Sequence, residues 1–185
     1  RAMLAVVDSG GQAALLAPTE VLAAQHLRTI QRQLGALAQG GMLGGSELGT
    51  QVTLITGSQS AQARKEALAK AAEGSAGIVI GTHALLGESV VFKDLGLIVV
   101  DEQHRFGVEQ RAKLWRKNTI PPHILVMTAT PIPRTLAMTL YGDLDVSVID
   151  ELPAGRKPIQ TLHLYESQRL RMFGLMKQEI AKGRQ

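Results

Sequence analysis

The stretch Leu97-Ile-Val-Val-Asp101-Glu-Gln-His104 decides the fold, because four apolar residues lead directly into two adjacent carboxylates. A short, continuously apolar run is typical of a strand buried on both faces, as in a parallel sheet covered by helices. In such sheets, ligands bind outside the carboxyl ends of the strands. The stretch therefore predicts a central strand that ends, at Asp101 and Glu102, on a binding edge.

Similar apolar segments alternate with helical patterns along the rest of the chain. This alternation predicts βαβ units, and so an α/β fold with a mainly parallel sheet flanked by helices. Besides residues 97–100, the expected strands are residues 13–17, 52–56, 77–81, 124–127 and 146–149. The expected helices are residues 19–34, 61–73, 109–117 and 133–141.

The two ends of the chain suggest a segment of a longer protein. Residues 1–8 have the pattern of the last turns of a helix, and no start signal precedes them. Residues 153–158 contain two prolines and a glycine, which is typical of a linker. Only one strand, at 159–164, and one helix, at 166–182, are expected after it, too little to bury a core. The sequence predicts a first lobe at 1–152, a linker at 153–158 and the start of a second lobe at 159–185.

Composition excludes several classes of protein. Apolar residues make up 45% of the 185 residues, which is enough for a folded core. The absence of cysteine excludes a disulfide scaffold and thiolate-held zinc or iron–sulfur sites. No apolar run approaches the roughly 20 residues that span a bilayer, and no secretory signal is recognisable. We therefore expect a cytoplasmic protein without a membrane partner.

The basic charge is unevenly distributed along the chain. The formal net charge is +4, but residues 1–152 hold 13 Lys and Arg against 14 Asp and Glu. Residues 153–185 hold 7 basic residues against 2 acidic ones. The first lobe is thus nearly neutral, and bulk charge would not bind it to a nucleic acid. With only six aromatic residues in the chain, a base-stacking platform is also disfavoured.

Asp101 and Glu102 are the candidate catalytic pair. Adjacent strand residues point in opposite directions, so the two carboxylates can take different roles. One can hold Mg²⁺, directly or through its waters, because Mg²⁺ prefers oxygen ligands. The other can orient and deprotonate a water that attacks a phosphoryl group. The alternative is an ordinary exposed strand end, since this short pattern is frequent by chance.

Small and hydroxyl residues follow the other predicted strands. The stretch Thr128-Ala129-Thr130 offers hydroxyls that can donate to carboxylates or to a neighbouring lobe, or Thr130 can simply cap a helix. Backbone amides at strand ends and helix starts can hold phosphate oxygens without reading bases. Each strand end taken alone also suits an ordinary turn. The candidate phosphate-contacting residues are Pro18, Thr19, Gly57, Thr82 and His83.

Taken in order, these motifs resemble motifs Ia, Ib, II and III of the superfamily 2 helicases. The resembling stretches are Ala17-Pro-Thr-Glu20, Thr56-Gly57, Gly81-Thr-His83, Asp101-Glu-Gln-His104 and Thr128-Ala-Thr130. The longer stretches 101–111 and 127–138 are more narrowly similar to RecG-type ATP-dependent DNA helicases, as are 141–145 and 150–153. The transcription–repair coupling translocases share a similar core, but Gln103 and residues 150–156 look more like the RecG type.

The resemblance implies a RecA-like lobe that uses ATP and Mg²⁺. The implied partners are branched or duplex DNA, a second helicase lobe and a wedge domain. It implies that Asp101 binds Mg²⁺ with ATP and that Glu102 is the catalytic base. Gln103 and His104 would complete this catalytic DEQH box and face the nucleotide–DNA coupling region. Thr128, Ala129 and Thr130 would couple hydrolysis to lobe movement. The residues that it puts near the DNA backbone are Pro18, Thr19, Gly57, Thr82 and His83.

The chain departs from the family pattern at its start. It contains no Gly-x-x-x-x-Gly-Lys-Ser/Thr phosphate loop, which the resemblance would put immediately before residues 1–8. Later motifs, including the arginine finger, are also missing from these residues. Without the loop, the ATP phosphates lose their main cradle, so we expect the 185 residues alone to be inactive. An alternative is a degenerate motor lobe that no longer uses nucleotide and only binds DNA or protein. The intact Asp101-Glu-Gln-His104 and Thr128-Ala-Thr130 motifs speak against this alternative.

Overall fold

The computed structural model divides into two units, Arg1–Ile132 and Pro133–Gln185. The predicted site residues Gln103, His104 and Thr130 lie outside the described residues, as do the helices predicted at 109–117 and 133–141. The described residues are 1–40, 49–102, 118, 120–129, 145–151, 155–156, 159 and 161–184.

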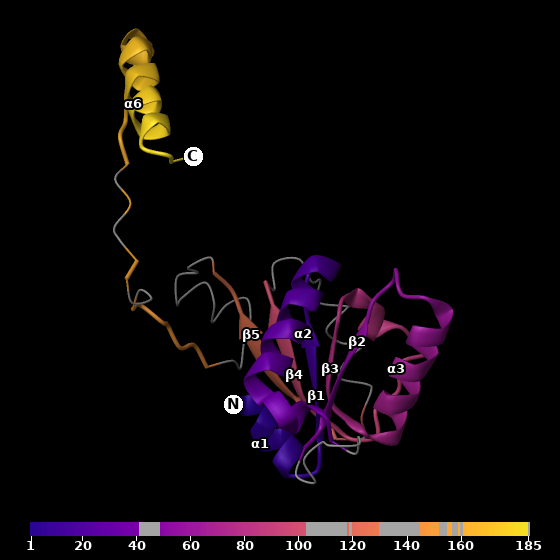
Figure 1. Cartoon of the computed structure of the whole chain (residues 1–185). Helices are drawn as coiled ribbons and strands as arrows, with labels where there is room; N and C mark the ends of the chain where they lie inside the picture. Colours follow the sequence, from indigo (N-terminus) through magenta and orange to yellow (C-terminus); the bar gives the residue numbers. More distant parts are fainter. Residues whose placement is uncertain are drawn as a thin grey trace. The chain divides into compact units, whose positions relative to one another are not determined.

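The first unit is built on one parallel sheet (Figure 1). Within the described residues the sheet has five strands in the order β2-β3-β1-β4-β5, and every pairing is parallel. The predicted α/β fold with a mainly parallel sheet is therefore confirmed. The strands are β1 (Gln12–Leu16), β2 (Gln51–Ile55), β3 (Ala76–Gly81), β4 (Leu95–Asp101) and β5 (His123–Met127). The helices are α1 (Ala2–Asp8), α2 (Glu20–Leu34) and α3 (Ala61–Glu73), with 3₁₀ turns η1 (Gly35–Ala38) and η2 (His83–Leu86).

The central strands are continuously apolar because both faces of the sheet are covered. Every residue of β1 and β3 is buried. Along β1, Ala14 and Leu16 face a core shared with α3, whereas Ala13 and Leu15 face a core shared with α1 and α2. This alternation is the period-2 geometry of a strand, applied to two hydrophobic faces instead of one.

Side chains at the helix starts confirm two of the predicted helices. The Thr19 hydroxyl accepts a hydrogen bond from the Leu22 amide at 3.3 Å and caps α2. The Ser60 hydroxyl accepts one from the Ala63 amide at 3.2 Å and caps α3. α3 ends at Gly74, whose φ of +82° is a left-handed conformation that favours glycine. None of the helices in the described part of the chain is long and apolar enough to cross a membrane.

A buried glutamine connects several elements at the end of the sheet where the strands begin. Gln12 is 2% exposed. Its Nε2 donates to the carbonyls of Ala71 and Ala76, at 2.9 and 2.8 Å. Its Oε1 accepts from the amides of Lys93 and Asp94, at 2.7 and 3.0 Å. One side chain thus connects the start of β1 to the end of α3, the start of β3 and the segment that enters β4.

The second unit contains η4 (Glu166–Gln168) and α6 (Arg169–Ala181), which confirms the helix predicted at 166–182. The strand predicted at 146–149 is wrong, and the described residues of 159–164 form no strand either. Val148 is 79% exposed and Ile149 is 93% exposed. An apolar segment becomes a strand only where a neighbour pairs its backbone, and no described residue pairs with these segments.

Candidate functional site

The parallel register brings the predicted site residues to one edge of the sheet. Leu16 pairs with both Gly81 and Val100, and Gly81 pairs with Ile55. On the other side of β4, Asp101 pairs with Met127. All five strands therefore end at the same level, and the motifs that follow them emerge side by side.

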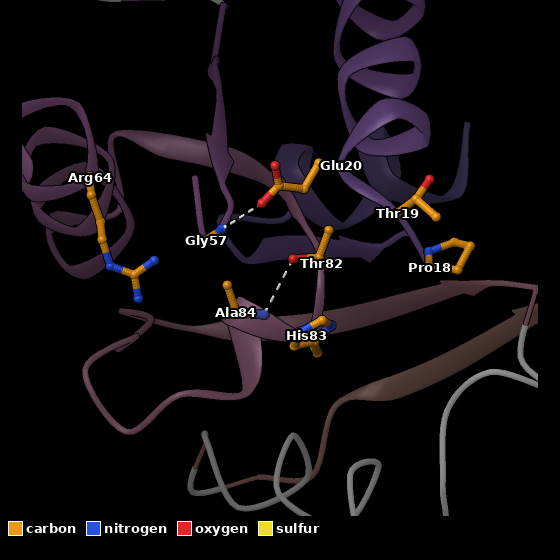
Figure 2. Close-up of a pocket in the computed structure, with 8 residues that line it drawn as sticks. All are labelled: Pro18, Thr19, Glu20, Gly57, Arg64, Thr82, His83 and Ala84. Carbon is orange, nitrogen blue, oxygen red and sulfur yellow. Dashed lines mark hydrogen bonds between the residues drawn. The ribbon is translucent and has the colours of Figure 1, made fainter. Parts of the chain in front are cut away.

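A pocket of about 440 Å³ opens at this edge, beyond the ends of β1, β2 and β3 (Figure 2). All five residues predicted to contact a phosphate backbone line it, together with Glu20, Arg64 and Ala84. The lining residues are Pro18, Thr19, Glu20, Gly57, Arg64, Thr82, His83 and Ala84.

Glu20 is a pocket residue whose part in the site the sequence did not indicate. Its Oε1 accepts hydrogen bonds from the amides of Gly57 and Ser58, at 3.0 and 3.1 Å, and its Oε2 accepts one from the Ser58 hydroxyl. The Ser58 hydroxyl and then the Ser58 amide hold the pKa of the Glu20 carboxyl below its usual value. The Gly57 amide, predicted to contact a phosphate, is thus hydrogen-bonded to a carboxylate of the same chain.

Arg64 was also missed by the sequence analysis. It lies in the first turn of α3, and its Nη1 donates to the Thr56 carbonyl at 3.0 Å. This bond brings a guanidinium to a pocket that also contains the Glu20 carboxylate and the His83 imidazole. The only signal in the sequence was an arginine soon after a helix start, which is common on solvent-exposed helix faces.

Glycine at position 81 allows β3 to approach β2 closely at the pocket. A Cβ at Gly81 would lie 2.1 Å from the carbonyl oxygen of Ile55 and 2.9 Å from Leu85 Cγ. Thr82 follows, 3% exposed, and its hydroxyl accepts from the Ala84 amide at 3.5 Å. The His83 side chain is exposed. In this stretch, Gly81 leaves room for the β2 backbone, and the Thr82 hydroxyl caps the turn that follows. His83 contributes an exposed imidazole.

Asp101 and Glu102 differ in backbone conformation. Asp101 is the last residue of β4, whereas Glu102 lies outside the strand with a φ of +51°. The expectation that the two carboxylates diverge because both belong to the strand is therefore corrected. A left-handed residue after the strand end reorients the chain instead, and such conformations in non-glycine residues are concentrated at functional sites.

The Asp101 carboxylate contacts helix α2. Asp101 Oδ2 lies 2.7 Å from His26 Nε2, and the two side chains are 20% and 28% exposed. His26 was not among the predicted site residues, because the sequence presents it only as a polar residue within a helix. The contact spans 75 positions of sequence, so it follows from the packing of α2 against the sheet.

Thr128 and Ala129 lie at the end of β5, next to the candidate catalytic pair Asp101 and Glu102. Because Asp101 pairs with Met127, Glu102 and Thr128 leave adjacent strands at the same level. Both Thr128 and Ala129 are exposed. The structure therefore brings the described part of the predicted coupling motif beside the described part of the predicted catalytic motif.

The described residues supply one carboxylate for a magnesium ion that binds together with a nucleotide. Within the described residues, no group of three or more His, Cys, Asp or Glu could hold a metal alone. Mg²⁺ commonly binds through one or two carboxylates, substrate phosphates and water, and Asp101 supplies one part-exposed carboxylate at the sheet edge. The chemistry fits Mg²⁺ that arrives with a nucleotide better than a resident metal site.

The sequence matches a known class of protein. Residues 1–139 match the model of the DEAD/DEAH box helicase family. The chain belongs to this family of superfamily 2 helicases, and its sequence is of the RecG type. The ATP-dependent DNA helicase RecG of Mycobacterium tuberculosis is 64% identical over 162 residues, which cover 86% of this chain and 22% of the relative. Its counterpart in Aquifex aeolicus is 45% identical over 97% of this chain and 22% of the relative. The chain thus spans about a fifth of these relatives.

Solved structures agree on the fold. A RecG structure bound to a three-way DNA junction is 36% identical and covers 98% of this chain and 23% of its own, with a TM-score of 0.75. The helicase Lhr of Mycobacterium smegmatis, at 17% identity, covers 75% of this chain and 20% of its own, with a TM-score of 0.54. The first unit is therefore a RecA-like helicase lobe.

Proposed function

We propose that this chain is part of an ATP-dependent DNA helicase that remodels branched DNA, such as replication forks and Holliday junctions, in recombination and repair. ATP hydrolysis would drive its movement along duplex DNA. The observation that carries the proposal is the shared sheet edge, where the Asp101–Glu102 pair and the pocket beyond β1, β2 and β3 lie together. The similarity to RecG proteins supports the substrate class.

The catalytic half of the site is the end of β4. Asp101 would bind the Mg²⁺ that accompanies ATP, because it offers a carboxylate anchored at a strand end between β1 and β5. The metal neutralises phosphate charge when bound. Glu102 would be the base that orients and deprotonates the attacking water, and its position outside the strand supports a separate role. Gln103 and His104 would link this motif to bound DNA.

The other half is the pocket, which we propose contacts the DNA backbone through Pro18, Thr19, Gly57, Thr82 and His83. Among the described residues, its lining offers hydroxyl, amide, imidazole and guanidinium groups beside the Glu20 carboxylate, and no Phe, Tyr or Trp ring for base stacking. Such groups contact phosphates and sugars, and so would act without reading the base sequence. The nearly neutral charge of residues 1–152 agrees with contact through placed groups rather than through bulk charge.

The proposed coupling motif is Thr128, Ala129 and Thr130, which would pass the hydrolysis signal to a second lobe. We propose that residues 1–152 are the first lobe, 153–158 a linker and 159–185 the start of the second lobe. Apolar side chains exposed on α6 support this, because a helix with such a surface is stable only when more protein covers it. A wedge domain elsewhere in the longer protein would engage the branch point.

The catalytic assignment is tested by Glu102→Gln in the longer helicase that we propose carries these residues. The amide keeps the size of the side chain but cannot take up a proton, so ATP should still bind while turnover falls by about 100-fold or more. Steady-state hydrolysis with branched DNA and binding of labelled ATP measure the two effects. Glu73→Gln, on the distant end of α3, is the matched control and should hydrolyse normally. Near-normal hydrolysis by the Glu102 variant would refute the assignment.

The 185 residues alone are expected to hydrolyse ATP negligibly, because they contain no phosphate-loop lysine. A hydrolysis assay on the purified 185-residue chain, with and without branched DNA, measures this directly. Robust DNA-stimulated hydrolysis would show that another group in these residues cradles the phosphates.

A further inference from the structure

Helix α2 carries a histidine that the proposed mechanism leaves without a role. His26 Nε2 lies 2.7 Å from Asp101 Oδ2, a short and well-formed hydrogen bond between partly buried side chains. Among the described residues, no other side chain hydrogen-bonds to this carboxylate. Within the described part of the chain, His26 is therefore the side chain that orients the Asp101 carboxyl group.

The chemistry of the pair defines which atom donates. An ionised carboxylate can only accept hydrogen bonds, so the bond requires a proton on His26 Nε2. The donor engages Oδ2, and no described side chain hydrogen-bonds to Oδ1, so this second oxygen of the carboxylate can meet another ligand. Groups that hydrogen-bond to a metal-binding residue in this way fix its orientation, and losing them typically lowers metal affinity or activity by about 10- to 100-fold.

The position of His26 is set by the fold and not only by its own rotamer. Leu22, Leu27 and Ile30 of α2 pack against the core on one face of the sheet. The start of the helix is held by the Thr19 cap and by the Glu20 bonds to the loop after β2. A helix anchored along this length presents the imidazole to Asp101 at a fixed place.

We propose that His26 is a positioning residue that holds the Asp101 carboxylate in the orientation needed to bind Mg²⁺ with a nucleotide. The inference rests on the proposed function, because it assumes that Asp101 meets Mg²⁺. It adds a residue from the second turn of helix α2 to the catalytic half of the site, which is otherwise the end of β4.

Calorimetric titration of the longer helicase with Mg²⁺ and a non-hydrolysable ATP analogue tests the inference. His26→Ala should weaken binding in Mg²⁺ by about 10-fold or more, and should leave binding in excess chelator unchanged. His26→Gln should recover most of the affinity, because its amide can donate at a similar reach. Gln33→Ala, at an exposed position of the same helix, is the matched control and should bind like the wild type.

The outcomes separate the inference from the function on which it rests. If wild-type protein shows no Mg²⁺-dependent nucleotide binding, the proposed function fails. If wild type binds but His26→Ala binds equally well in Mg²⁺, the positioning role is refuted. Equal losses with Mg²⁺ and with chelator would also refute it, because they indicate general damage to the fold. Should the alanine variant fail to fold, wild-type-like affinity of a folded His26→Phe, which cannot donate, would overturn the proposal.

Discussion

At the scale of single residues, the pocket contains its own anion. The Glu20 carboxylate accepts hydrogen bonds from the amide of Gly57, which the sequence indicated as a phosphate contact, and from the amide of Ser58. A DNA phosphate that reaches these amides must therefore share them with Glu20 or displace it. These bonds also hold the loop after β2 in place. Glu20 therefore shapes the pocket and at the same time competes with a phosphate for the Gly57 and Ser58 amides.

The pKa of Glu20 offers a direct test of these bonds. The Ser58 hydroxyl is the largest cause of its lowered pKa, so Ser58→Ala should move the pKa up towards the ordinary value of 4.5. Because the pKa is depressed in the folded state, the bonds stabilise the fold above the ordinary value and are lost as pH falls through the folded pKa. Carboxyl NMR titration measures both variants. Ser9→Ala, a distant serine, should leave the Glu20 pKa in place, and an unchanged pKa in Ser58→Ala would contradict the assignment.

At the scale of elements, the sheet depends on a polar anchor at the end away from the site. Gln12 uses both hydrogens of its amide nitrogen and accepts two bonds at its oxygen, with partners on three other segments. Buried polar groups are tolerated when all are satisfied, and they then specify one arrangement of the chain. The spacing of β1, β3 and β4 at their starts, and hence the shared edge at their ends, relies on this side chain.

Gln12→Leu should destabilise the first unit strongly. Leucine has a similar size, but it removes the Gln12 partner of two carbonyls and two amides. Each of these groups that finds no water or other partner lowers the free energy of unfolding by about 1–3 kcal/mol. Urea unfolding followed by circular dichroism measures the loss. Gln33→Leu, on the exposed side of α2, should change stability by no more than about 0.5 kcal/mol. Equal stability of the two variants would show that water or a rearrangement satisfies the freed groups.

At the scale of the whole molecule, the two units differ in what holds them together. The first has buried side chains on both faces of its sheet, whereas none of the described residues of the second is buried. An isolated 13-residue helix such as α6 is only marginally stable in water, because its few hydrogen bonds do not offset the free-energy cost of nucleation. Stability is therefore concentrated in residues of the first unit.

Hydrogen exchange on the 185-residue chain should reveal this difference. Amides of β1, β3 and β4 should be protected up to the global free energy of unfolding, whereas amides of α6 should exchange close to the rate of an unfolded peptide. Exchange followed by NMR at neutral pH resolves the two groups, and α3 provides an internal comparison for a helix that packs on a core. Strong protection of α6 would show that other parts of this chain cover it.

Most of the fold could be predicted because its signals are local. The runs around Ala13, Ile78 and Val99 are apolar at every position, and that pattern has few solutions other than a strand buried on both faces. The same signal was misleading at Val148 and Ile149, which are apolar but have no strand beside them. Apolar character indicates that a segment can be buried, whereas pairing depends on neighbours that lie elsewhere in the chain.

The sequence by itself determined the order of strands and helices in the described residues of the first unit, and that the motifs after these strands meet at one edge. Both follow from periodicity and from the polarity of parallel strands. Only the tertiary structure decided the contacts of Glu20 with Ser58, of Arg64 with Thr56, and of His26 with Asp101. Helix α2, for example, looks like an ordinary amphipathic helix in sequence. Its packing on the sheet is what brings His26 to a carboxylate 75 positions away, because such contacts depend on strand register and helix docking rather than on local pattern.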